Sequence, residues 1–156
     1  MSGRDQPAGE LGRRWNELGS ILRSRRLLAV LHHGSSARLT PTNLRALDVL
    51  AGGAGTRIGE LADRVGIDET TASRLADRLE AAGLVERRRS TEDRRVALLA
   101  LTPEGDGLAR LVAEQRRRFF RDVLDALEPD ERSELVRLTA KAADALRATS
   151  EELIAR

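Results

Sequence analysis

Apolar residues recur every three or four positions along most of this chain, which is the spacing that places side chains on one face of an α-helix. The pattern predicts six helices, over residues 10–32, 41–51, 56–65, 69–82, 103–127 and 129–153. The clearest apolar stripes mark the third and fourth helices: Ile58, Leu61, Ala62 and Val65, then Ala72, Leu75, Ala76 and Leu79.

The boundaries of these two short helices are marked by residues that favour helix ends. Thr56 is expected to open the third helix, and Gly66 to end it in the left-handed conformation that glycine adopts without strain. Asp68 is the expected N-cap of the fourth helix, and Gly83 is expected to end it. Two helices joined by so tight a turn are a helix-turn-helix candidate.

After Gly83 the hydrophobic period changes from 3.6 to 2, which predicts two strands over residues 84–89 and 95–101. A short polar connection joins them into a hairpin. Thr102-Pro103 then has the residues of a helix start, as Thr40-Pro41 does earlier, because proline is tolerated at the first helical position. The sequence therefore predicts a mostly α chain (α+β) with one β-hairpin.

Composition limits the class of protein. The 156 residues suffice for one compact domain, and no cysteine is present for a disulfide, a thiolate metal site or a thiol switch. The net charge is only +2, so the pI near 10.2 indicates little about a partner. No apolar run approaches the roughly 20 residues that span a bilayer. Residues 1–9 look like a disordered leader without a signal peptide, and we expect a cytoplasmic protein without a membrane contact.

The polar face of the fourth helix carries short hydroxyl side chains and arginines. Such residues suit base edges and phosphates in a DNA major groove. The candidate DNA-binding residues of this helix are Thr70, Thr71, Ser73, Arg74 and Arg78.

The hairpin adds a second candidate surface. Residues 87–95 hold five arginines and two acidic residues, and Arg88, Arg94 and Arg95 are candidate contacts of a wing that enters a minor groove. The alternative is an ordinary solvated turn. Residues 56–101 carry nine arginines and nine acidic residues, so DNA attraction would depend on where the cations point.

The run LADRVGIDETTASRLADRLEAAGLVERRRSTEDRRVALLALTPEGDGL resembles the winged helix-turn-helix core of MarR-type transcriptional regulators. The resemblance is close over 40–127 and extends in architecture over 10–150. Asp93-Arg94-Arg95 matches the Asp-x-Arg of the family's wing, which implies that Arg95 enters the minor groove and that Asp93 supports the wing. Ala72 stands where the family commonly has a larger β-branched residue, a difference that affects local packing and not the expected function.

The resemblance implies a winged helix-turn-helix with long N- and C-terminal dimerisation helices. The expected organisation is a leader (1–9), a first dimerisation helix with its connection (10–39), a DNA-binding lobe (40–102) and C-terminal dimerisation helices (103–156). The C-terminal Leu/Ala stripe has little of its own chain to pack against, which favours a homodimer over a monomeric bundle.

The expected function is a homodimeric repressor that binds double-stranded DNA at a pseudo-palindromic operator. The resemblance also implies release by a small-molecule effector, bound near the first and second helices and the start of the fifth. His32, His33 and Arg38 are candidates to line that pocket, with simple surface exposure as the alternative. No cofactor, metal or enzymatic activity is expected. The competing hypothesis is a protein–protein interaction module that does not read DNA.

Overall fold

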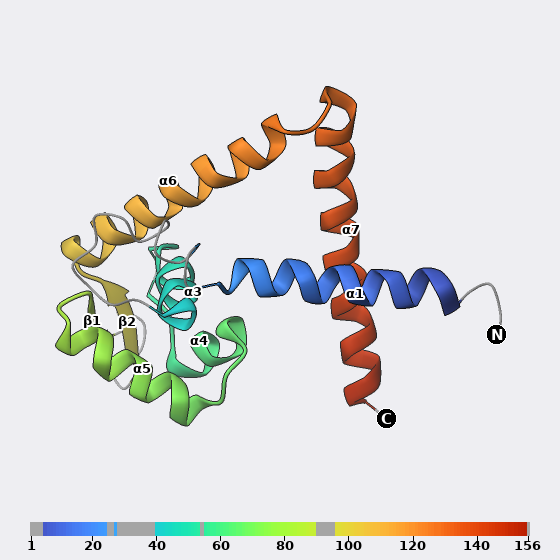
Figure 1. Ribbon diagram of the computed structural model, residues 1–156. Helices are drawn as coiled ribbons and strands as arrows, with labels where there is room; N and C mark the ends of the chain where they lie inside the picture. The colour runs from blue at the N-terminus through green and yellow to red at the C-terminus, as the bar shows by residue number, and fades with distance from the viewer. Residues whose placement is uncertain (1–4, 25–26, 28–39, 54, 90–95, 156) are drawn as a thin grey trace. The chain divides into compact units, whose positions relative to one another are not determined.

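The computed structural model describes residues 5–24, 27, 40–53, 55–89 and 96–155. The chain divides into two compact units, residues 1–116 and 117–156, which are described separately. The elements, labelled in Figure 1, are α1 (Asp5–Leu22), α3 (Pro41–Leu50), α4 (Ile58–Val65), α5 (Glu69–Ala81), β1 (Val85–Arg89), β2 (Ala97–Leu101), α6 (Pro103–Asp125) and α7 (Pro129–Ile154). The expected mostly helical chain with one hairpin is confirmed.

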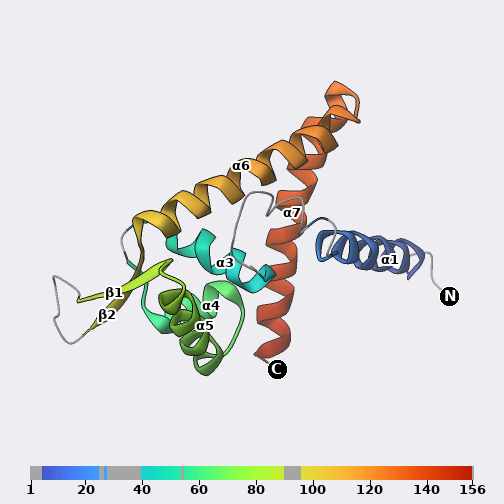
Figure 2. The ribbon, with the colours of Figure 1, turned by 60° about the vertical axis from the view of Figure 1, so that its left-hand side comes forward.

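Helices α3, α4 and α5 and the antiparallel hairpin β1–β2 share one hydrophobic core, and both views show them gathered together (Figures 1 and 2). The apolar stripes expected on α4 and α5 supply much of it. Ile58 is half-buried, and the other seven stripe residues are buried. The rest of this cluster comes from α3, the hairpin and the residue just before it: Ala46, Val49, Leu50, Leu84, Val85 and Leu99. Leu44 and Leu47 of α3 and Ala109 and Val112 of α6 are buried as well.

The helix starts marked by threonine and proline form as expected. Thr40 Oγ1 accepts a hydrogen bond from the backbone N–H of Asn43 at 3.2 Å, and Asn43 Oδ1 accepts from the N–H of Thr40 at 2.8 Å, so α3 begins with a capping box. Pro41 occupies the first turn. Thr102 Oγ1 accepts from the N–H of Gly105 at 3.0 Å at the start of α6.

The start of α4 differs from the prediction. Helix α4 begins at Ile58, and Thr56 does not open it. Thr56 instead forms a β-bridge with Leu99, with N–H···O=C distances of 2.9 and 2.8 Å in the two directions. The N–H and C=O groups of buried Thr56 are therefore both hydrogen-bonded to β2. The sequence pattern, which was interpreted as helical here, did not indicate this bridge to the hairpin.

The N-terminal helix also differs from the prediction at both ends. Helix α1 begins at Asp5, within the expected leader 1–9, because a proline such as Pro7 is tolerated in a first turn, whose N–H groups have no helical partner. The helix ends at Leu22 and does not run unbroken to residue 32. Ser24 Oγ accepts from the N–H of Leu27, which is again helical, at 3.2 Å, as a new N-cap would.

Two long helices keep exposed apolar faces. On α1, exposed side chains follow helical spacing: Leu11, Trp15, Leu18 and Leu22. Helix α7 has no buried residue, and Leu135, Leu138 and Leu146, which belong to the C-terminal Leu/Ala stripe, are 42%, 48% and 50% exposed. Within its own unit, each of these two helices therefore leaves its apolar face exposed.

Candidate nucleic-acid interface

Helix α5 is held by its ends and by its buried stripe. Gly66 closes α4 with φ 73°, the left-handed conformation expected from the sequence. Asp68 caps α5, because its carboxylate accepts from the backbone N–H of Thr71 at 2.8 Å and from the Thr71 hydroxyl at 2.7 Å. Both hydrogen bonds hold the pKa of Asp68 below its ordinary value, and the one from the Thr71 hydroxyl has the larger effect.

The face of α5 opposite the core presents most of the expected DNA-binding residues. Thr70, Arg74 and Arg78 are exposed, and Ser73 is half-buried. Arg74 and Arg78 form no ion pair with any other residue that the structure describes, so both guanidinium groups are available to an anion. Thr71 is exposed, but its hydroxyl proton is committed to the Asp68 cap.

Arg87 connects the hairpin to α5, a contact that was not anticipated from the sequence. Its Nε donates to Glu80 at 3.2 Å, and its Nη2 pairs with Asp77. Arg87 lies opposite buried Leu99 in the strand register, so its side chain starts on the face of the hairpin that covers the core and α5. Two features of the sequence could have predicted this contact. Alternation from Val85 places Arg87 on the same face of the strand, and Asp77 and Glu80, three residues apart, lie close together on one helix.

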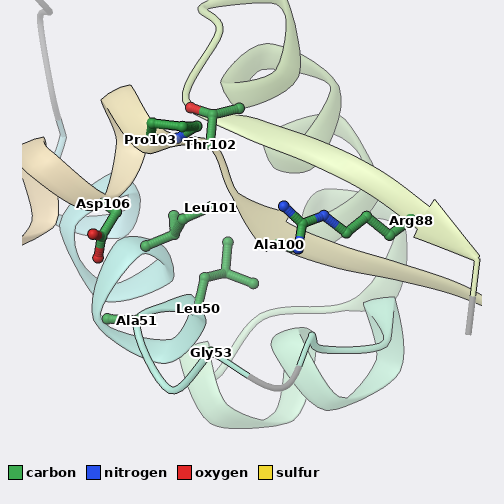
Figure 3. Close-up of a pocket in the computed structure, with 9 residues that line it drawn as sticks. All are labelled: Leu50, Ala51, Gly53, Arg88, Ala100, Leu101, Thr102, Pro103 and Asp106. Carbon is green, nitrogen blue, oxygen red and sulfur yellow. The ribbon is translucent and has the colours of Figure 1, made fainter.

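Arg88 lies on the other face of β1, in register with Leu98 and away from α5. It pairs with Glu86, with Nε–Oε1 2.6 Å, and borders an open pocket of about 350 Å³ (Figure 3). The remaining lining comes from the end of α3, β2 and the start of α6: Leu50, Ala51, Gly53, Ala100, Leu101, Thr102, Pro103 and Asp106. Arg88 therefore does not share a surface with the polar face of α5.

Other candidates fall outside the described residues. The wing residues Asp93, Arg94 and Arg95 belong to this group, as do His32, His33 and Arg38. In the parts of the chain that are described, no three acidic, histidine or cysteine side chains gather as a metal site would require. None of the described helices combines the length and the apolar character of a membrane span.

The sequence of the chain matches a known protein family and a characterised relative. Residues 39–96 match the model described as "MarR family". Over 107 residues, the chain is 34% identical to the HTH-type transcriptional repressor MdtR of Bacillus subtilis, an alignment that covers 69% of each protein.

Solved structures agree in fold. A MarR family protein from Bacillus stearothermophilus superposes with a TM-score of 0.80 at 24% identity, over 94% of this chain and 99% of that one. The PcaV transcriptional regulator of Streptomyces coelicolor, solved in complex with its natural ligand, gives a TM-score of 0.61 at 27% identity, over 88% of this chain and 92% of that one.

Proposed function

Since this chain belongs to the MarR family of winged helix-turn-helix DNA-binding transcriptional regulators, which are not enzymes, we propose that it is a repressor that binds a pseudo-palindromic operator as a homodimer. Family membership decides against the alternative of an interaction module that does not read DNA. The cytoplasm is the proposed site of action.

The observation that carries the proposal is the outer face of α5. Arg74 and Arg78 are exposed and have no ion-pair partner among the described residues, beside the polar side chains of Thr70 and Ser73. Guanidinium groups and hydroxyls are the groups that contact guanine edges and phosphates in the major groove. We assign base and phosphate contacts to this face, and minor-groove contact to Arg94 and Arg95, with Asp93 supporting the wing.

The uncovered apolar faces support a homodimer. Leucines on α7 and the stripe on α1 would expose apolar surface at a cost of roughly 25 cal/mol per Å² unless a second copy covered them. The proposed organisation therefore keeps dimerisation segments over 10–39 and 103–156 around the lobe 40–102. Two lobes related by a two-fold axis would read half-sites about one helical turn, roughly 34–36 Å, apart.

Release by a small molecule is the remaining part of the proposal. PcaV, which is 27% identical, was solved with its natural ligand. In this chain, the pocket beside Arg88 joins apolar residues at the end of α3 to the start of α6, two of the elements near which an effector is expected. The effector would have to bind two dimer geometries with different affinity, with a coupling of about 1–3 kcal/mol.

Selection of bound DNA from a random pool, followed by affinity measurement on the selected duplex, tests the proposal. For six to ten phosphate contacts, log K should fall by about five to nine units per log unit of salt.

Arg95→Ala and Arg74→Ala should each weaken DNA binding by about 1–3 kcal/mol, and Arg74→Ala should also alter base preference. Arg147→Ala, on α7, is the control and should bind like wild type. Failure to select any DNA, or binding that is indifferent to salt, would contradict the proposal.

A further inference from the structure

The polar face of α5 carries acidic residues as well as the arginines assigned to DNA contact. Around the helix, Asp77 falls between Ser73 and Arg74, near the middle of the face opposite the buried stripe. Glu80 lies one turn further along, toward the side that the hairpin covers. Both side chains are substantially exposed, at 63% and 42%.

These two carboxylates oppose the function proposed for the face on which they lie. Arg74 and Arg78 together carry two positive charges, and Asp77 and Glu80 cancel them. A carboxylate brought toward the phosphates is repelled, and the repulsion grows as water is displaced from between them. Without another cation, this half of the helix would have no net attraction for DNA.

Arg87 is that cation. Its Nε–Oε2 distance to Glu80 is 3.2 Å, and its Nη2 pairs with Asp77, so one planar guanidinium holds both carboxylates. The contacts span seven and ten residues of sequence and connect β1 to α5. With Arg87 included, the net charge of these five side chains rises from zero to +1.

We infer that Arg87 is a positioning residue for DNA recognition: it neutralises Asp77 and Glu80 and turns their carboxylates from the DNA, and does not itself contact the DNA. The inference rests on the proposed function, because it takes α5 as the helix that faces DNA. Arg87 reaches the two carboxylates from the hairpin and is occupied by them, whereas Arg74 and Arg78 project from α5 itself and pair with no other described residue. The contribution of so exposed an ion pair to folding is small.

A mutant cycle tests the inference. Arg87→Met is measured in the wild-type background and in the Asp77→Asn/Glu80→Gln background, on duplex DNA selected by the wild-type protein. In the wild-type background, Arg87→Met should weaken binding roughly tenfold, because it exposes two unpaired carboxylates. In the background without the carboxylates, the same substitution should change affinity by less than about threefold. The Asp77→Asn/Glu80→Gln protein itself should bind random-sequence duplex more tightly than wild type.

Arg89→Met is the matched control. Arg89 lies two residues further on the same strand face, is exposed, and forms no ion pair with another described residue. Arg89→Met should change DNA affinity by the same factor in both backgrounds. A difference seen only for Arg87→Met then comes from its pairing with Asp77 and Glu80, and not from the more positive charge of the Asp77→Asn/Glu80→Gln background. The urea midpoint of every variant should lie close to that of wild type.

Each other outcome has a definite meaning. An equal loss for Arg87→Met in both backgrounds would overturn the inference and make Arg87 a direct DNA contact. A loss in Asp77→Asn/Glu80→Gln as large as in Arg87→Met would also overturn it, because the contact would then orient the hairpin and not mask charge. If the wild-type protein selects no DNA, the proposed function fails; if it does and the cycle shows no coupling, the inference alone fails.

Discussion

Gly105 allows the first turn of α6 to lie directly against the backbone of the hairpin. A Cβ atom at this position would come within 1.9 Å of the carbonyl oxygen of Leu84. Thr102 completes the junction, because its hydroxyl donates to the carbonyl of Gly83 at 2.6 Å and its N–H donates to the carbonyl of Leu84 at 3.1 Å. The glycine in the Leu-Thr-Pro-Glu-Gly segment is therefore required by space.

Gly105→Ala should destabilise the protein by about 1–3 kcal/mol, the usual cost of overpacking, because the clash is with backbone that cannot rotate away. Gly107 is the matched control: it lies in the same helix, and nothing lies within 4 Å of a Cβ placed there. Gly107→Ala should stabilise by roughly 0.5–1 kcal/mol through helix propensity. Urea unfolding at fixed protein concentration measures both, and a Gly105→Ala protein as stable as wild type would contradict the packing described.

Asp68 gives the stability of the DNA-binding lobe an acid-sensitive component. The Thr71 hydrogen bonds lower the pKa of Asp68 from its ordinary value, so the ionised form is the one that folding favours. Its contribution is complete above the unfolded pKa and is lost as pH falls through the folded pKa. Asp68→Asn retains a neutral cap, so the stability difference from wild type should shrink as pH falls below about 4. Urea midpoints between pH 3 and pH 7 measure it; a difference that does not vary with pH would count against the charged cap.

At the scale of elements, periodicity and caps located the helices that form the core. The stripes of α4 and α5 are buried as expected, because apolar residues on one face of a helix leave water when that face packs against the neighbouring elements. Thr56 was misassigned because its role depends on Leu99, 43 positions away, and no local pattern reports a β-bridge at that distance. Arg87 was not recognised for the same reason, since an ion pair between elements needs their packing first.

The ion pair between Asp48 of α3 and Arg116 of α6 joins elements that lie far apart in sequence. Arg116 donates through both Nη atoms, with Nη2–Oδ1 3.2 Å, and the two side chains are 43% and 35% exposed for Arg116 and Asp48. This bidentate contact fixes the first half of α6 against the lobe.

A double-mutant cycle with Asp48→Asn and Arg116→Gln should give a coupling free energy of about 0.2–1 kcal/mol, in the range of partly exposed pairs. The coupling should diminish in 1 M salt because the pair is open to solvent. Urea unfolding supplies the four stabilities. Strict additivity at low salt would show that the contact does not hold α6.

Assembly of the protein concerns the exposed apolar faces of α1 and α7. The sequence predicted an apolar stripe in the C-terminal helix, but only the structure shows that the leucines of α7 and the apolar side chains of α1 are exposed. The wing tip, with Arg94 and Arg95, lies outside the described residues, so its part in the site remains a prediction from the sequence.

The apolar stripe of α7 should be needed for assembly. Leu138→Glu with Leu146→Glu places two charges on the stripe, and sedimentation should show loss of a species of twice 17.1 kDa, together with aggregation or unfolding. Ser133→Glu, on the opposite side of α7, is the control and should remain dimeric. A wild-type protein that sediments as a monomer would contradict the dimer proposal.

The most direct test of the account is the form of the DNA that the wild-type protein selects from a random pool, with the stoichiometry of the complex. We predict an inverted repeat whose half-sites are centred about one helical turn, roughly 10 base pairs, apart, bound by two chains. Enrichment of a single unrepeated half-site bound by one chain, or of no sequence, would contradict the claim that two copies of α5 and its wing read DNA together.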